Sequence, residues 1–123
     1  SLANKVSMDN KIPVFFIEKE NTQLIEKVRN QIPGAIFPEE NSKLSCPALV
    51  TALASRLNSV ITIDNGIMHM ISIANIPMII LFGPTNSDKF APKNNFVKVL
   101  DSKKIYNTKD INAITVDDVF NLI

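Results

Sequence analysis

The only histidine of the chain follows closely after an acid and a glycine. Asp64, Gly66 and His69 come directly after the apolar residues 60–63, in the order VITIDNGIMH. Open α/β sheets bind ligands at the carboxyl ends of their strands. A helix that begins near Ile67 would turn its N–H groups toward this bend, and Gly66 would let a diphosphate approach the backbone. The pattern predicts an anion site in which Asp64 orients amides or binds a sugar hydroxyl, while His69 donates a hydrogen bond or charge.

A purely structural explanation accounts for the same residues. Asp64, Asn65 and Gly66 also form an ordinary turn sequence, and Asp64 is a common type of helix cap. A lone histidine such as His69 often has no role beyond packing. Spacing alone leaves the functional and the structural explanation open.

Scarce residue types exclude several other kinds of site. The three glycines, at positions 34, 66 and 83, are too far apart to form either glycine-rich phosphate loop. One cysteine and one histidine exclude zinc sites built from several such residues, and only carboxylates remain to hold a metal. We therefore expect no metal and no other cofactor. A net charge of +1 also gives no support to nucleic-acid binding.

The uncharged residues 65–87 could suggest a membrane span, because a spanning helix needs about 20 residues. Polar residues interrupt this stretch, and Asn75-Ile76-Pro77 is a helix-stop signal. We expect a helix, a turn and a buried strand there, and no transmembrane segment. A lone cysteine is compatible with a reducing compartment, so a cytoplasmic location is expected.

Short apolar runs alternate with helical patterns along the chain, which predicts an α/β domain with a parallel sheet flanked by helices. Residues 78–82 should form a central strand, 60–63 a strand covered on both faces, and 96–100 an edge strand. The remaining predicted elements are strands at 13–17 and 35–37, a helix capped by Asn21-Thr22, a helix capped by Ser45, a helix at 67–75 and a last helix with Thr115 and Asp118 as a capping box.

The chain has 123 residues, which suits one domain. Residues 1–11 are expected to be a tail or the end of a preceding helix, and residues 12–123 the domain itself. Nucleotide-binding domains of this class usually open with a strand that meets the ligand phosphates, and nothing before Pro13 resembles such a strand. We therefore expect a fragment of a longer chain.

Three motifs together resemble the carboxyl-terminal half of heptosyltransferases, which form glycosyltransferase family nine. The motifs are DNGIMH at 64–69, ANIP at 74–77 and LFGPT at 81–85. The family pattern is D-[ST]-G-x-x-H followed by a proline-started strand and F-G-P-T. The resemblance runs from about Pro13 to Ile123, and its specific part covers residues 60–92. It implies a GT-B enzyme of two facing Rossmann-like domains, of which this chain is the donor-binding one.

The resemblance also implies roles for individual residues. Asp64, Gly66 and His69 would contact the diphosphate and sugar of the donor, and Thr85 would lie beside them at the next strand end. Asn65 stands where the family has Ser or Thr, and its short hydrogen-bonding side chain is expected to keep the turn.

Two weaker matches concern the nucleoside. Leu44 matches a position near the adenine, where an apolar side chain can pack on a base, although ordinary loop packing is the better explanation. Glu20 is matched only ambiguously to a ribose-binding acid. In the family, glycines usually follow the first strand, whereas this chain has charged residues there.

The implied reaction is an inverting, metal-independent transfer from a nucleotide-activated, ADP-heptose-like sugar to a lipopolysaccharide-type acceptor bound by the other domain. The catalytic base would lie in the amino-terminal domain, so this chain alone should not be active. The enzyme could work peripherally at the inner membrane.

Two alternatives remain. The first is a catalytically inactive Rossmann-like interaction module that associates with itself through an exposed sheet edge. The second is a nucleotide-sugar epimerase-like domain, although such enzymes place more acids and histidines in this half.

Overall fold

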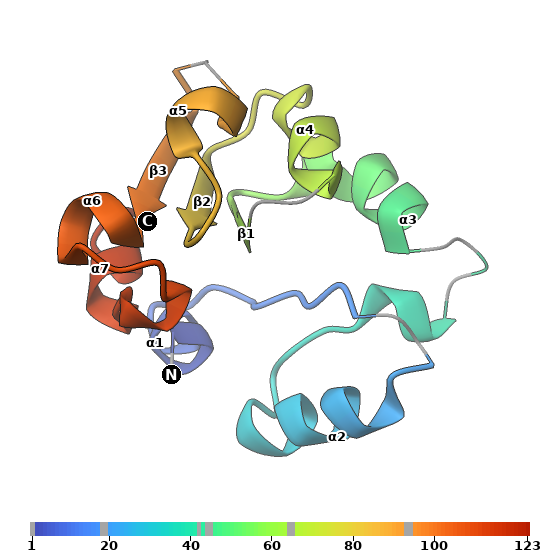
Figure 1. Cartoon of the computed structure of the whole chain (residues 1–123). Helices are drawn as coiled ribbons and strands as arrows, with labels where there is room; N and C mark the ends of the chain where they lie inside the picture. The colour runs from blue at the N-terminus through green and yellow to red at the C-terminus, as the bar shows by residue number, and fades with distance from the viewer. Residues whose placement is uncertain (1, 18–19, 42, 44–45, 64–65, 93–94) are drawn as a thin grey trace. The chain divides into compact units, whose positions relative to one another are not determined.

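The computed structural model describes residues 2–17, 20–41, 43, 46–63, 66–92 and 95–123. The chain divides into two compact units, Ser1–Ala52 and Leu53–Ile123. The two are called the N-terminal unit and the C-terminal unit, and each is described by itself (Figure 1).

The C-terminal unit contains a parallel sheet of three strands, β1 (Val60–Ile63), β2 (Met78–Phe82) and β3 (Val97–Asp101). The strand order is β1-β2-β3, so β2 is central as predicted. Ile63 pairs with Leu81, and Leu81 pairs with Leu100. All three carboxyl ends therefore lie at one edge of the sheet, as Figure 1 shows.

Short helices connect and flank these strands. They are η2 (Ala54–Arg56), α4 (Gly66–Ser72), α5 (Ser87–Phe90), α6 (Ser102–Tyr106), η3 (Ile111–Ala113) and α7 (Val116–Phe120). α6 packs against β2, β3 and η3. Thr115 and Asp118 form the predicted capping box of α7. Asn75, in the predicted helix-stop signal, adopts a left-handed conformation with φ 56° after α4 has ended.

The core of this unit surrounds β2. Met78, Ile80 and Phe82 are at most 1% exposed, and each such apolar side chain contributes about 1.5–3 kcal/mol when fully buried. β1 differs from the prediction that both of its faces are covered, because its residues are half-buried and Ile63 is 53% exposed. The position of β1 explains the difference, because β1 is an edge strand of the described sheet.

The N-terminal unit is mainly helical among its described residues. It contains α1 (Leu2–Met8), α2 (Thr22–Gln31), η1 (Pro38–Asn41) and most of α3 (Cys46–Leu53). The side chain of Asn21 accepts a bond from the Leu24 N–H at 3.4 Å, which confirms the predicted cap of α2. Phe15 stacks on Phe37 with ring centroids 6.0 Å apart.

The strands predicted at 13–17 and 35–37 are wrong as strands. They are reduced to one parallel bridge between Val14 and Ile36, with the Phe15 N–H donating to the Ile36 carbonyl at 2.9 Å. Two prolines account for the short pairing: Pro13 has no N–H to donate, and Pro38 follows Phe37 at once. A pair of short strands is also marginal without a third partner.

The uncharged residues 65–87 contain α4, a turn and β2 within their described part, in the predicted order. Among the residues described above, no helix combines the length and apolar character needed to cross a membrane.

Candidate functional site

The segment after β1 carries the predicted diphosphate site. α4 begins at Gly66, close to the predicted start at Ile67. Asp64 and Asn65 lie outside the described residues, so their contacts stay predictions. The described part of the motif consists of the α4 backbone from Gly66 onward and the His69 side chain.

His69 is exposed on α4, whereas Met68 and Ile71 are 0% and 2% exposed. Residues three apart share one face of a helix, so Met68 and Ile71 both face the core, whereas His69 lies on the exposed face of α4. The His69 carbonyl accepts a hydrogen bond from Ser72 Oγ at 2.7 Å. The imidazole is thus at the surface, where a ligand can reach it.

Residues 83–85, called the 83–85 loop, follow β2 directly. Because β1 and β2 are parallel neighbours, this loop and the segment leading to α4 leave the sheet at the same edge. Thr85 in the loop is half-buried. The structure therefore puts His69 and Thr85 in segments that follow adjacent strand ends.

Gly83 lies against the main chain of residues 109–111. A Cβ at this position would be 2.9 Å from the Lys109 carbonyl oxygen and 3.0 Å from Ile111 Cβ. Such contacts are too short for a close-packed interior, and a main-chain oxygen cannot turn aside as a flexible side chain can. Gly83 does not have a positive φ, so close packing is what requires a glycine here.

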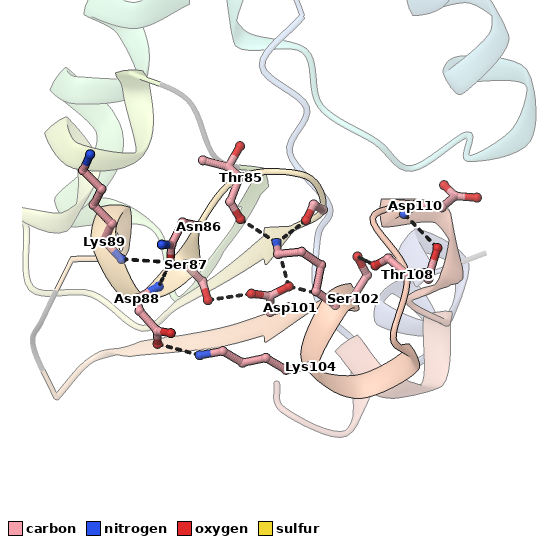
Figure 2. A network of polar contacts seen from close by, with 12 residues as sticks. Thr85, Asn86, Ser87, Asp88, Lys89, Asp101, Ser102, Lys104, Thr108 and Asp110 are labelled. Carbon is pink, nitrogen blue, oxygen red and sulfur yellow. Dashed lines mark hydrogen bonds and ion pairs between the residues drawn. The ribbon is translucent and has the colours of Figure 1, made fainter.

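Lys103, in α6, holds the main chain of the 83–85 loop. Its Nζ donates to the Gly83 carbonyl oxygen and, at 2.6 Å, to the Thr85 carbonyl oxygen. The same Nζ lies 3.1 Å from Asp101 Oδ1. Figure 2 shows the Thr85 carbonyl and Asp101 meeting in this network. The loop at the end of the central strand is therefore tied to the beginning of α6.

Asp101 ends β3, caps α6 and supports Lys103. Its Oδ1 accepts a bond from the Lys103 main-chain N–H at 2.9 Å, and its Oδ2 accepts one from Ser87 Oγ at 2.6 Å. Asp101 is 3% exposed and Ser87 4%. Burial opposes ionisation of the carboxyl, but the hydrogen bonds from Ser87 and Lys103 outweigh it and hold the pKa of Asp101 below its ordinary value. The carboxylate therefore stays charged opposite the lysine.

Sequence reasoning missed Ser87, Asp101 and Lys103. An aspartate between an apolar run and Ser-Lys-Lys is a recognisable helix cap, so the role of Asp101 at α6 could have been found. The contact from Lys103 to Gly83 spans 20 positions of sequence, and no local pattern indicates it.

The two residues matched to the nucleoside belong to the N-terminal part of the chain. Glu20 is exposed, and Leu44 lies outside the described residues. Both assignments stay predictions.

Comparison with known proteins bears on the motif as a whole. The family model described as Glycosyltransferase family 9 (heptosyltransferase) matches residues 42–117, which is more than half of the chain. That range includes β1, α4, the 83–85 loop and the Asp101–Lys103 pair. Neither the search of curated proteins nor the search of solved structures found a match. The match over residues 42–117 confirms the resemblance seen in the three motifs, and the chain belongs to glycosyltransferase family 9, the heptosyltransferase family.

Proposed function

We propose that this chain is the donor-binding, Rossmann-like half of a GT-B glycosyltransferase. The donor is a nucleotide-activated, ADP-heptose-like sugar, and the acceptor is of the lipopolysaccharide type. Transfer is inverting and metal-independent. The observation that carries this proposal is the family match over residues 42–117, because it includes both the strand-end histidine motif and the 83–85 loop.

Asp64, Asn65, Gly66 and His69 bind the diphosphate and sugar after β1, and Thr85 joins them from the neighbouring strand end. When the glycosidic bond breaks, negative charge builds on the leaving diphosphate. Hydrogen-bond donors held ready for that charge lower the barrier. The exposed imidazole of His69 suits this task, whereas a buried imidazole would not.

The proposal assigns no catalytic residue to this chain. The base comes from the amino-terminal domain of a longer protein, and domain closure around the donor excludes water. The complete enzyme works in the cytoplasm, at the inner membrane where a lipopolysaccharide-type acceptor is made. Leu44 and Glu20 contribute to nucleoside binding.

The test is the affinity of the complete protein for ADP, measured by calorimetry. His69→Ala should weaken ADP binding by about tenfold or more, since a hydrogen bond to a charged group contributes about 1.5–3 kcal/mol. Met70→Ala is the matched control, because Met70 is 41% exposed on the same helix and has no proposed contact. Both variants should unfold at the wild-type temperature.

Asp64→Ala, with Asp64→Asn as its conservative partner, extends the same experiment to the residues before α4. Unchanged ADP affinity in both His69→Ala and Asp64→Ala would remove the proposed site. Absence of ADP binding by the unsubstituted protein would overturn the donor class.

A further inference from the structure

The ammonium group of Lys103 has one acceptor for each of its N–H donors. A lysine ammonium carries three N–H donors. In the structure Nζ has three acceptors, the carbonyl oxygens of Gly83 and Thr85 and Asp101 Oδ1. With all three donors directed at the protein, Lys103 acts on its surroundings through the main chain of the 83–85 loop.

The carboxylate beneath Lys103 is buried and has further hydrogen bonds. Asp101 is fixed by Ser87 Oγ at 2.6 Å and by the main-chain N–H of Lys103 at 2.9 Å, and it is 3% exposed. Residues 109–111 lie close to Gly83, on the side where a Cβ would stand. A charged lysine seated on a buried carboxylate thus sets the direction of two carbonyl groups in one short loop.

Those two carbonyls matter because of where the loop lies. It follows the central strand at the edge where the family motif begins after β1. A carbonyl oxygen carries partial negative charge and would repel a diphosphate. With the Gly83 and Thr85 oxygens committed to Lys103, the loop is pre-organised for an anion before the ligand arrives.

We infer that Lys103, seated on Asp101, is a positioning residue for the donor site, which it serves by orienting the carbonyl groups of Gly83 and Thr85 away from the bound diphosphate. This inference rests on the proposed function. It adds to it a specific device within this chain, Ser87–Asp101–Lys103, that prepares the 83–85 loop for an anionic ligand.

The adjacent Lys104 shows what an ordinary lysine of the same helix does. Its Nζ pairs with Asp88 at 2.6 Å, and the two side chains are 57% and 76% exposed. Figure 2 shows this pair together with Asp101. Exposed ion pairs of this kind have little energetic effect. Lys104 is therefore a control matched in residue type, charge and helix.

The experiment compares Lys103→Met with Lys104→Met in the complete protein, with ADP as the probe and calorimetry as the readout. Each variant removes one positive charge, so a difference between them cannot come from net charge. We expect Lys103→Met to weaken ADP binding about tenfold, equivalent to about 1.4 kcal/mol, and Lys104→Met to leave it within about twofold. Lys103→Arg should not restore affinity, because a planar guanidinium cannot direct donors at three converging acceptors.

Two further measurements separate positioning from other roles. The salt dependence of ADP binding should be the same in Lys103→Met as in the unsubstituted protein, because a lysine that touched phosphate directly would lower the slope on removal. Ser102→Ala serves as a control for stability alone, since Ser102 is 0% exposed and bonds the Thr108 carbonyl rather than the 83–85 loop. It should leave ADP affinity unchanged.

Ser87→Ala provides a second variant in case Lys103→Met does not fold. It removes only the bond to Asp101 Oδ2, and we expect ADP binding to weaken about threefold, equivalent to about 0.7 kcal/mol. If the unsubstituted protein binds ADP and both Lys103→Met and Ser87→Ala bind it as Lys104→Met does, the positioning role is wrong and the proposed function stands. A lowered salt slope in Lys103→Met would likewise replace positioning with direct contact. If the unsubstituted protein binds no ADP, the proposed function fails and takes this inference with it.

Discussion

The segments that follow β1 and β2 leave the same edge of one sheet, yet they are held in different ways. After β1, His69 is exposed on α4, whereas the preceding Met68 is buried. After β2, the carbonyls of the 83–85 loop are bound by Lys103, which in turn lies on a carboxylate that is 3% exposed. One segment presents a polar side chain to solvent, and the other uses its polar groups to fix the backbone.

This contrast teaches how a small sheet can serve both binding and stability. A side chain that binds a ligand must be able to reach it, so its removal should alter affinity with little effect on folding. A buried polar network has satisfied partners, and its removal leaves groups without them. Substitutions on the two sides should therefore separate the loss of ligand affinity from the loss of stability.

The largest effect on stability is expected from Asp101→Ala. This change removes the cap of α6 and leaves Lys103 and Ser87 without their common partner. We expect the free energy of unfolding to fall by about 3 kcal/mol, near the lower end for a broken buried ion pair because the Lys103 side chain is 30% exposed. Urea denaturation measures this loss. A loss no larger than that of His69→Ala would contradict the contrast between the two strand ends.

The contribution of the Asp101 carboxylate to stability should depend on pH. Its pKa in the folded protein lies below the ordinary value of 3.8, so ionised Asp101 stabilises the fold above that value and the benefit is lost as pH falls through the folded pKa. The stability difference between the unsubstituted protein and Asp101→Asn should therefore be constant near neutral pH and shrink in acid. A difference independent of pH would show that charge on Asp101 does not matter.

A smaller loss is expected from Gly83→Ala, on the β2 side of the comparison. The added Cβ would lie 2.9 Å from the Lys109 carbonyl oxygen, so the main chain must shift. Overpacking of this kind costs about 2 kcal/mol. Gly34→Ala is the matched control, because a Cβ there meets nothing within 4 Å and Gly34 does not have a positive φ. It should be neutral or stabilise by up to about 1 kcal/mol through the unfolded chain.

Thermal unfolding of the two glycine variants gives the comparison directly. Equal unfolding temperatures for Gly83→Ala and Gly34→Ala would mean that the approach of residues 109–111 to Gly83 is not close enough to matter.

Much of the fold of the C-terminal unit could be predicted, because β1 and β2 are runs of mainly apolar residues. Residues 60–63 and 78–82 were predicted with the bounds that β1 and β2 have, and the capping box of α7 was also predicted. The N-terminal strands could not be predicted in the same way. Short runs between prolines look like strands locally, but pairing decides whether they form a ladder, and pairing is not a local property.

In the candidate site, too, local patterns could be predicted and contacts between distant segments could not. The histidine motif was recognisable because Asp64, Gly66 and His69 are close in sequence. Asp101 and Lys103 were not recognised, since their partners at positions 83, 85 and 87 come from another loop. A polar network made by distant segments leaves no spacing for sequence analysis to detect. The burial of this network, which raises the energetic cost of losing one of its hydrogen bonds, is likewise visible only in the folded chain.

The smallest difference is expected between two serines with the same chemistry, Ser72 in α4 and Ser102 at the start of α6. Ser102 Oγ donates to the Thr108 carbonyl at 2.8 Å and Ser72 Oγ to the His69 carbonyl at 2.7 Å. Ser102 is 0% exposed and Ser72 half-buried, so only the Thr108 carbonyl lacks ready water as a substitute donor. Ser102→Ala should cost about 1 kcal/mol. Ser72→Ala should change stability by less than about 0.5 kcal/mol, because the higher helix propensity of alanine in α4 offsets part of the lost hydrogen bond. Equal losses in urea denaturation would mean that burial does not set the cost of losing these hydrogen bonds, and the contrast between the exposed α4 and the buried start of α6 would then have no energetic basis.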